Sequence, residues 1–206
     1  MRIINLCHGA GNGVDSACVM TASNMLIGKG YHGDTNSCVC PLIREFVIAT
    51  NDAIPLELLG ELYTPLIWEI LGTRNPDVES ERVFCFVDWL CREVLPLWYP
   101  GLKIDAIVDY SSAQEAGRAL QWLGPNPVRD HASYACHYAQ KDTIYPECGY
   151  GPTAVRYVSY ALRYMKSEAA WRKCPDIVRR VAAIGEKQKI EFAITIEELE
   201  NALLGN

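Results

Sequence analysis

The sequence predicts a mainly α-helical fold. Apolar residues recur at spacings of three and four in several segments, which is the periodicity of a helix with one buried face. Proline and Ser/Thr-x-x-Glu signals mark several helix starts, and convincing alternating strands are nearly absent. No internal repeat or long linker interrupts the chain. We therefore expect one compact multi-helix domain over residues 1–206, with a sub-division into 1–124 and 128–206 as the alternative.

Local start and stop signals define the helices of the first half. Asp15 or Ser16 suits the N-cap of the first helix, and Pro41 suits the first turn of the second. Pro65 lacks an amide hydrogen, so it should divide the third segment. The segment Arg2–Cys7 is expected to form a short strand or an irregular lead-in, followed by a glycine-rich loop over residues 9–13. The expected helices span about residues 15–27, 41–52, 55–71 and 77–98.

Two capping boxes organise the second half. Ser112 with Glu115, and Thr195 with Glu198, each match the pattern in which two side chains satisfy the first amides of a helix. The only candidate strand is the segment 189–194. The expected helices span about residues 112–123, 130–140, 153–166, 168–173 and 176–187, with a short last helix from 195.

Composition and charge exclude some classes of function. With 19 basic and 25 acidic residues the formal charge is −6, which argues against a broad duplex-binding surface. No uncharged apolar window is long enough to span a bilayer, so we expect no membrane association. Nine cysteines in a chain without an evident export signal indicate reduced thiols, and hence a cytoplasmic location.

The charge is unevenly distributed along the chain. Residues 153–189 hold nine basic and three acidic residues. On the helix expected from residue 153, Arg156, Tyr160 and Arg163 project from the side opposite the apolar stripe. Guanidinium groups beside tyrosines suit stacking on a ring and gripping an anion, so these residues, with Arg74, are the candidate ligand-binding set. The alternative is a basic face that pairs with acidic residues of the same chain.

A second candidate site is the cluster of Cys and His residues near the N-terminus. His8 with Cys18 or Cys38 could act as a base–nucleophile pair, because a neighbouring imidazole promotes the thiolate. Zinc is the other option, with Cys7, His8, Cys38 and Cys40 as ligands. The one-residue gap between Cys38 and Cys40 fits a zinc knuckle poorly. The plain alternative is a set of buried or idle thiols, with no cofactor.

Several short motifs occur in a familiar order: Ala17-Cys18-Val19-Met20, a Cys-x-Cys-Pro run, Asn51-Asp52, Gly72-Thr73-Arg74 and the segment 88–96. In this order they resemble a family of uncharacterised proteins carried by bacteriophages and some bacteria, which has no established activity. The similarity covers roughly residues 8–120. It implies provenance rather than mechanism, and the basic segment lies outside it.

The sequence therefore favours a phage-type accessory protein that acts by binding a host protein or a small, nucleotide-like anion. The absence of a recognisable catalytic motif favours this hypothesis over catalysis. Two alternatives stay open. One is a Cys/His- or zinc-dependent enzyme, and the other is a structural, virion-associated helical protein that forms a homo-oligomer.

Overall fold

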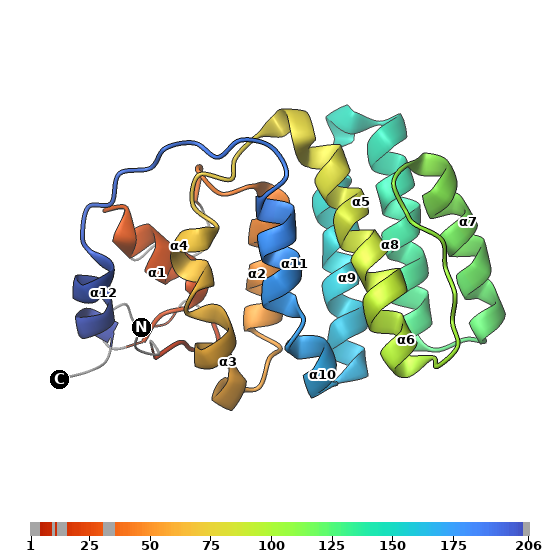
Figure 1. The fold of residues 1–206 in the computed structure, drawn as a ribbon, viewed down its shortest axis with the longest axis horizontal. Helices are drawn as coiled ribbons and strands as arrows, with labels where there is room; N and C mark the ends of the chain where they lie inside the picture. Colours follow the sequence, from red (N-terminus) through yellow and green to blue (C-terminus); the bar gives the residue numbers. More distant parts are fainter. Residues whose placement is uncertain (1–4, 10, 12–15, 31–35, 204–206) are drawn as a thin grey trace. The chain divides into compact units, whose positions relative to one another are not determined.

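The computed structural model describes residues 5–9, 11, 16–30 and 36–203, and these residues fold mainly into helices (Figure 1). Within this part of the chain, isolated bridges join Leu6 and Gly11 to Ala17, and there is no strand. The prediction of a mainly α-helical fold is confirmed. No helix among the described residues is both long enough and apolar enough to cross a membrane.

The chain forms two compact units. The first joins Met1–Asn75 to Val178–Asn206, and the second is the continuous stretch Pro76–Ile177. These boundaries differ from the sub-division near residues 124–128 that the sequence suggested. The first unit contains α1 (Val19–Leu26), α2 (Pro41–Asn51), α3 (Leu56–Tyr63), α4 (Leu66–Glu69) and α12 (Ile196–Leu203). The boundary near residue 177 falls inside α11 (Cys174–Ala182).

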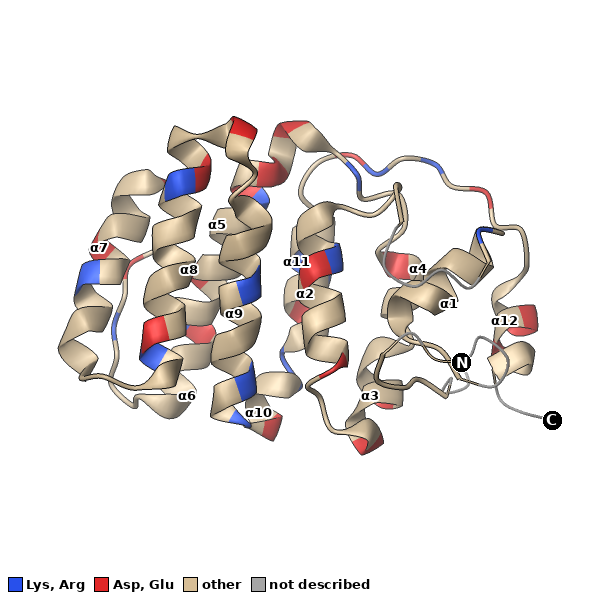
Figure 2. Ribbon diagram, turned by 180° about the vertical axis from the view of Figure 1, so that it is seen from behind, with Lys and Arg blue, Asp and Glu red and all other residues tan. Residues whose placement is uncertain are grey.

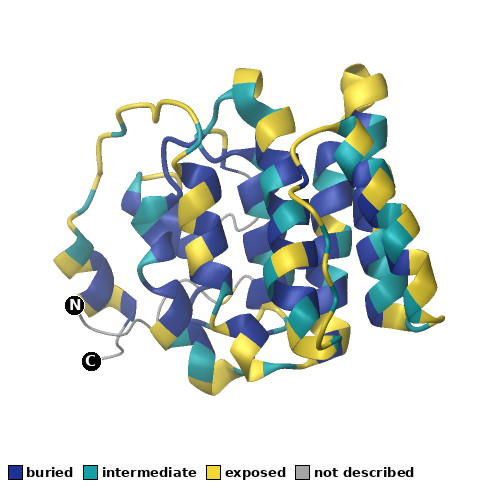
Figure 3. Ribbon diagram, turned by 45° about the vertical axis from the view of Figure 1, so that its right-hand side comes forward, coloured by how far each residue is buried: buried dark blue, intermediate teal, exposed yellow. Residues whose placement is uncertain are grey.

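The second unit is built around the helices α5 (Glu79–Trp89), α7 (Tyr110–Leu120), α8 (Pro127–Ile144) and α9 (Gly151–Met165). It also contains η1 (Pro76–Val78), the π-helical turn η2 (Leu90–Val94), α6 (Leu95–Trp98), η3 (Gln121–Leu123), η4 (Pro146–Cys148) and α10 (Glu168–Trp171). Helix α8 packs against both α7 and α9, and α5 packs against α8 and α9 (Figure 1). Buried residues cover the facing sides of these helices (Figure 3).

Helix α9 shows how the sequence produces this packing. Val155, Val158 and Leu162 are fully buried, and their spacings of three and four residues place them on one face. Burial of each such side chain contributes about 1.5–3 kcal/mol. Arg156 and Arg163 lie on the exposed side of the same helix. The amphipathic pattern predicted for this segment is therefore confirmed.

Contacts between distant segments close the first unit. The backbone amide of Gln188 donates to the carbonyl of Gly72 at 2.7 Å, and that of Ala193 donates to the carbonyl of Leu26 at 2.8 Å. The guanidinium Nε of Arg179 lies 2.8 Å from Glu69 Oε2. The largely exposed segment 183–195 is thereby held against the N-terminal part of the unit (Figure 3).

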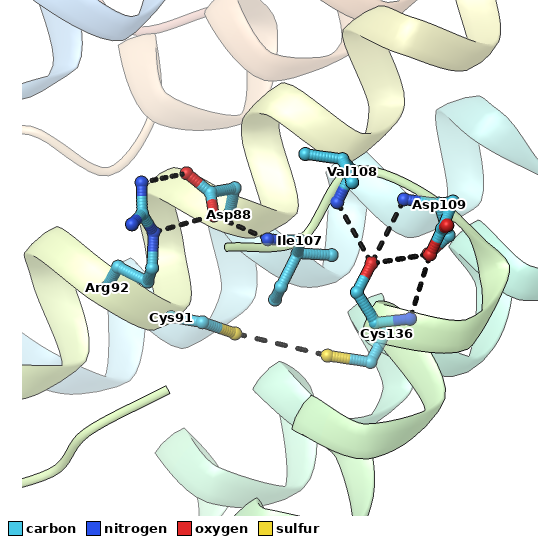
Figure 4. A network of polar contacts seen from close by, with 8 residues as sticks. Asp88, Cys91, Arg92, Ile107, Val108, Asp109 and Cys136 are labelled. Carbon is cyan, nitrogen blue, oxygen red and sulfur yellow. Dashed lines mark hydrogen bonds and ion pairs between the residues drawn. The ribbon is translucent and has the colours of Figure 1, made fainter. Parts of the chain in front are cut away.

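Some expected helix boundaries were wrong. Helix α1 begins at Val19 with Cys18 as its N-cap, so Ser16 does not cap it, and Asp15, the other expected cap, lies outside the described residues. Helix α7 begins at Tyr110, and its capping box joins Asp109 to Ser112 instead of Ser112 to Glu115. Asp109 is in the extended conformation that an N-cap requires, so it accepts the Ser112 amide at 2.9 Å (Figure 4).

Two further expectations also need correction. The segment 189–194 forms no strand. The single helix expected over residues 77–98 contains a π-helical turn at Leu90–Val94. Pro96 offers no N–H to the carbonyl of Arg92, four residues earlier, and its ring crowds that carbonyl. The Leu95 amide instead bonds the carbonyl of Leu90, five residues back, which is the π-helical pattern.

Candidate ligand-binding pocket

Helices α8 and α9 present aromatic rings to each other at seven-residue spacing. His131 and Tyr138 lie on α8, while Tyr157 and Tyr164 lie on α9 and Tyr150 directly precedes it. Seven residues are about two helical turns, so each set stays on nearly one face. The two helices run antiparallel, which lets rings from the two sets alternate (Figure 1). We call these five residues the aromatic row.

Neighbouring rings of the row lie within contact distance along its whole length. The centroid of Tyr164 is 5.1 Å from that of His131, and His131 is 5.7 Å from Tyr157. Tyr157 is 5.3 Å from Tyr138, which is 5.8 Å from Tyr150. Interplanar angles of 24°, 28° and 11° make the first three pairs stacked. Such pairs contribute about 0.5–1.5 kcal/mol each beyond burial, so the row holds its own geometry.

Two further tyrosines support the row from its sides. The Tyr134 centroid lies 5.1 Å from that of Tyr157. Tyr160 meets His131 and Tyr157 edge-on, at centroid distances of 5.4 and 5.9 Å. The rings around Tyr157 therefore hold it on several sides. Burial and its tyrosine neighbours raise the pKa of Tyr157, so its phenol stays neutral at physiological pH.

One end of the row is closed by a cation. The Lys141 ammonium lies 5.3 Å from the centroid of Tyr138 and 5.4 Å from that of Tyr150, both within the range of a cation–π interaction. Next to it in the chain, the buried carboxylate of Asp142 accepts the backbone amide of Gly151 at 2.6 Å. This bond joins the end of α8 to the start of α9 and fixes the turn that carries Tyr150.

The other end of the row opens into a pocket of about 520 Å³. Its lining residues are His131, Tyr160, Arg163, Tyr164 and Lys166. The volume falls within the range of about 300–1,000 Å³ that small-molecule sites occupy. A flat ligand placed here would continue the stack of rings that begins at Tyr150.

The electrostatics of the pocket are cationic. Arg163 and Lys166 are exposed, and neither has an ion-pair partner among the residues that the structure describes. Helix α9 carries no acidic residue, and Figure 2 shows only Lys and Arg colouring along it. The pocket therefore offers two unneutralised positive charges to an anion.

Lys166 and His131 occupy unusual environments. Lys166 has φ of 49°, and it is the one residue other than glycine with positive φ in the described part of the chain. A bulky side chain adopts this conformation at a cost, and such strain concentrates at functional sites. The Nδ1 atom of His131 is buried without a hydrogen-bond partner. Burial lowers the pKa of His131, against a smaller opposing effect of Asp130, which favours the neutral imidazole at physiological pH.

The structure brings together part of the ligand-binding set that the sequence predicted. Tyr160 and Arg163 both line the pocket. Arg156 lies two turns earlier on the exposed side of α9 and does not line it. Arg74 belongs to the first unit, where its backbone amide donates to the Cys38 carbonyl at 3.0 Å. A ligand role for Arg74 stays a prediction.

Sequence reasoning missed the contribution of α8 and of the C-terminal end of α9. His131, Tyr164 and Lys166 were not in the nominated set, although all three line the pocket. The signal was present in the seven-residue spacing of Tyr150, Tyr157 and Tyr164 and in the matching spacing of His131 and Tyr138. An aromatic residue repeated every two turns on consecutive helices predicts interlocking rings between them.

Part of the basic segment pairs within the chain, as the alternative interpretation expected. Besides the ion pair of Arg179 with Glu69, the Lys187 ammonium donates to the backbone carbonyl of Glu69 at 2.7 Å. Arg172 pairs with Glu168 at 2.8 Å. The basic segment is therefore not one uniform anion-binding surface, and the pocket is the part of it that combines cations with rings.

The N-terminal cysteines occupy separate environments. Cys18 is buried, its sulfur accepts the Thr21 amide at 3.3 Å, and it lines a small cavity of about 110 Å³ with Asn51 and Asp52. His8 Nε2 is 2.9 Å from the carbonyl oxygen of Ile54, so this hydrogen bond of its imidazole is to the backbone and not to a thiol.

The remaining residues of the proposed zinc set have surroundings that differ from one another. The Cys38 thiol donates to Asn36 Oδ1 at 2.9 Å, the backbone amide of Cys7 donates to the Ala17 carbonyl, and Cys40 is the buried N-cap of α2. Within the described ranges no three His, Cys, Asp or Glu side chains are placed to hold a metal ion. The catalytic and zinc sets stay predictions.

A second pair of cysteines lies in the core of the other unit. The sulfurs of Cys91 and Cys136 are 3.9 Å apart and fully buried (Figure 4). Their hydrogen bond, followed by burial, raises the pKa of Cys91 well above its usual value, which keeps the thiol protonated and unreactive. Next to them Asp88 accepts the Ile107 amide at 2.8 Å and pairs with Arg92 at 2.7 Å. These contacts stabilise the fold around η2.

Comparisons with models of known protein families, with curated proteins and with solved structures give no match.

Proposed function

We propose that the protein acts by binding a small anionic ligand that carries an aromatic ring, and that a nucleotide is the class that fits best. The observation that carries this proposal is the pocket at the open end of the aromatic row, where Arg163 and Lys166, which have no ion-pair partner in the described part of the chain, lie beside two tyrosines. The resemblance of the first half of the chain to phage-borne proteins supports a phage-type accessory role for this binding.

Each lining residue has a distinct part in this proposal. The planar guanidinium of Arg163 can hold a phosphate through two parallel hydrogen bonds, while Lys166 supplies a compact point charge. Tyr164 is 52% exposed, so a ligand ring can reach its free edge and face. Because the ring of His131 already contacts Tyr160 and Tyr164, these two side chains lose little conformational entropy on binding.

Calorimetric titration with adenosine monophosphate tests the proposal. Hydrogen bonds to charged groups are worth about 1.5–3 kcal/mol, so Arg163→Ala should weaken binding by roughly ten- to a hundredfold. Tyr164→Ala should also weaken it, whereas Tyr164→Phe retains the ring and should bind nearly as the wild type does. Arg172→Ala is the matched control, because Arg172 pairs with Glu168 outside the pocket.

Titrations with inorganic phosphate and with adenosine measure separately how the two parts of a nucleotide bind. Each should bind more weakly than the monophosphate, because each engages either the cations or the rings alone. Failure of adenosine, guanosine, cytidine and uridine monophosphates to bind at millimolar concentration would contradict the proposal.

A host protein is the second candidate occupant. Tyrosine and arginine are the commonest anchors of protein interfaces, and Tyr134 is 50% exposed next to the row. Affinity capture from a bacterial lysate, with the wild type and Tyr134→Ala compared, tests this candidate. If a host protein is the occupant, the wild type should capture a partner that the Tyr134→Ala variant does not capture, although the variant binds nucleotide as the wild type does. A captured set that is identical for the two proteins would contradict it.

A further inference from the structure

We infer that the site continues beyond the pocket and takes a short segment of single-stranded nucleic acid. This inference rests on the proposed function and names the substrate class of the same site. It follows from the arrangement of charge and rings along the exposed side of α9.

The first observation is the spacing of cations on α9. Arg156 and Arg163 lie on the same exposed side, seven residues apart, with Tyr160 between them. At a rise of about 1.5 Å per residue the two positions are roughly 10 Å apart along the helix axis. A mononucleotide that places its phosphate on Arg163 cannot also reach Arg156, whereas the phosphates of a short chain can reach both.

The second observation is the narrowness of the cationic strip. The protein carries −6 overall, and α9 is free of acidic residues in a chain that is otherwise acidic. A duplex presents phosphates on two strands and would need a wider basic surface. One strand needs only a single line of cations beside rings on which its bases stack.

The third observation is the supply of exposed aromatic surface next to that strip. Tyr164 is 52% exposed and Tyr134 is 50% exposed, and both contact rings of the aromatic row. Base stacking on tyrosine tolerates any base, because every base has a π face. We therefore expect little sequence preference. The strip has room for only a few nucleotides, since it is two helical turns long.

The experiment measures fluorescence anisotropy of the full chain with a labelled eight-residue oligothymidylate, and competes it with unlabelled thymidine monophosphate and with the unlabelled octamer. The octamer should compete at least tenfold better than the monophosphate. Arg156→Ala should remove most of that gain and leave monophosphate affinity within twofold of the wild type. Arg163→Ala should weaken both, and Arg172→Ala should change neither.

The salt dependence provides an independent readout. For single strands the slope of log K against log salt changes by about 0.7 for each phosphate that the protein neutralises. Removal of one cation by Arg156→Ala should therefore lower the slope by about that amount for the octamer only. A duplex of the same length should bind no better than the monophosphate. Far-ultraviolet circular dichroism and a melting curve establish that each variant is folded.

The outcomes distinguish this inference from the proposed function. Equal affinity for monophosphate and octamer overturns the inference and leaves the nucleotide pocket intact, whereas no binding of either overturns both. Octamer binding without measurable monophosphate binding supports a site for a single strand and contradicts the proposed mononucleotide pocket. Equally tight binding of an acidic peptide of the same charge overturns it in favour of a protein partner.

Discussion

At the level of single residues, His131 is the titratable group at the centre of the pocket wall. It stacks on Tyr157 and Tyr164 and meets Tyr160 edge-on, so three rings surround its imidazole. Asp130 is the charged neighbour on its own helix, and Arg163 and Lys166 share the pocket from the other side. Burial dominates this balance and favours the neutral form.

Stability should therefore depend on pH through His131. Above the ordinary pKa of 6.5 the imidazole is neutral in both the folded and unfolded states, and its contribution is fully present. As pH falls below that value, the unfolded state binds a proton first, and the free energy of unfolding decreases until the lowered pKa of the folded state is reached. Urea unfolding at pH 7.5 and 5.5 should show a larger loss for the wild type than for His131→Phe, which keeps a ring but cannot titrate. Equal losses would contradict this assignment.

At the level of elements, the sequence predicted best where the signal is local. Pro41 begins α2 at its first turn, and Thr195 and Glu198 form the capping box of α12 as expected, with the Glu198 carboxylate accepting the Thr195 amide at 2.7 Å. These signals act within one turn of chain, so no tertiary context alters them. The start of α7 was placed one turn too late, because Ser112 completes a box with Asp109 upstream instead of opening one with Glu115.

The sequence predicted only the part of the candidate site that depends on local signals. Tyr160 and Arg163 follow from the periodicity of a single helix, which the sequence of α9 contains by itself. His131 reaches the pocket only because α8 packs antiparallel to α9 in a particular register. That register depends on the buried faces of both helices and on the turn between them, and neither helix encodes it alone.

Asp142 joins the end of α8 to the start of α9 through its hydrogen bond with the Gly151 amide. Asp142→Ala should lower the free energy of unfolding by about 0.5–2 kcal/mol, because the first amides of α9 lose an acceptor that acts as a cap. Asp142→Asn retains an acceptor oxygen and should lose less. Denaturant unfolding checks both variants. Equal destabilisation by the two would show that the negative charge, and not the hydrogen bond, is what matters.

At the level of the whole molecule, one unit is discontinuous and the other is not. The first unit depends on contacts between residues near 72 and residues near 188, and Gly72 lies where the two segments meet. Gly72 has φ of 75°, and a Cβ atom added to it would overlap the backbone carbonyl oxygen of Gln188. Only glycine satisfies both requirements.

Gly72→Ala should lower the melting temperature more than Gly30→Ala does. Gly30 has a similar φ of 73°, but a Cβ atom there meets nothing within 4 Å. Both substitutions incur the left-handed cost of roughly 1–2 kcal/mol, and only Gly72→Ala adds the clash with the segment 183–195. Differential scanning calorimetry measures the difference. Equal melting temperatures for the two variants would mean that the segment moves aside without loss.

The discontinuity of the first unit has a consequence for the order of events during synthesis. Residues 76–177, which contain the whole pocket, leave the ribosome before the segment that closes the first unit. The second unit can therefore be complete while Met20, Phe46 and the other core residues of the first unit still lack α12 and the segment 183–195 that precedes it. During that interval the first 75 residues expose apolar surface, and they are the part of the nascent chain that most needs a chaperone.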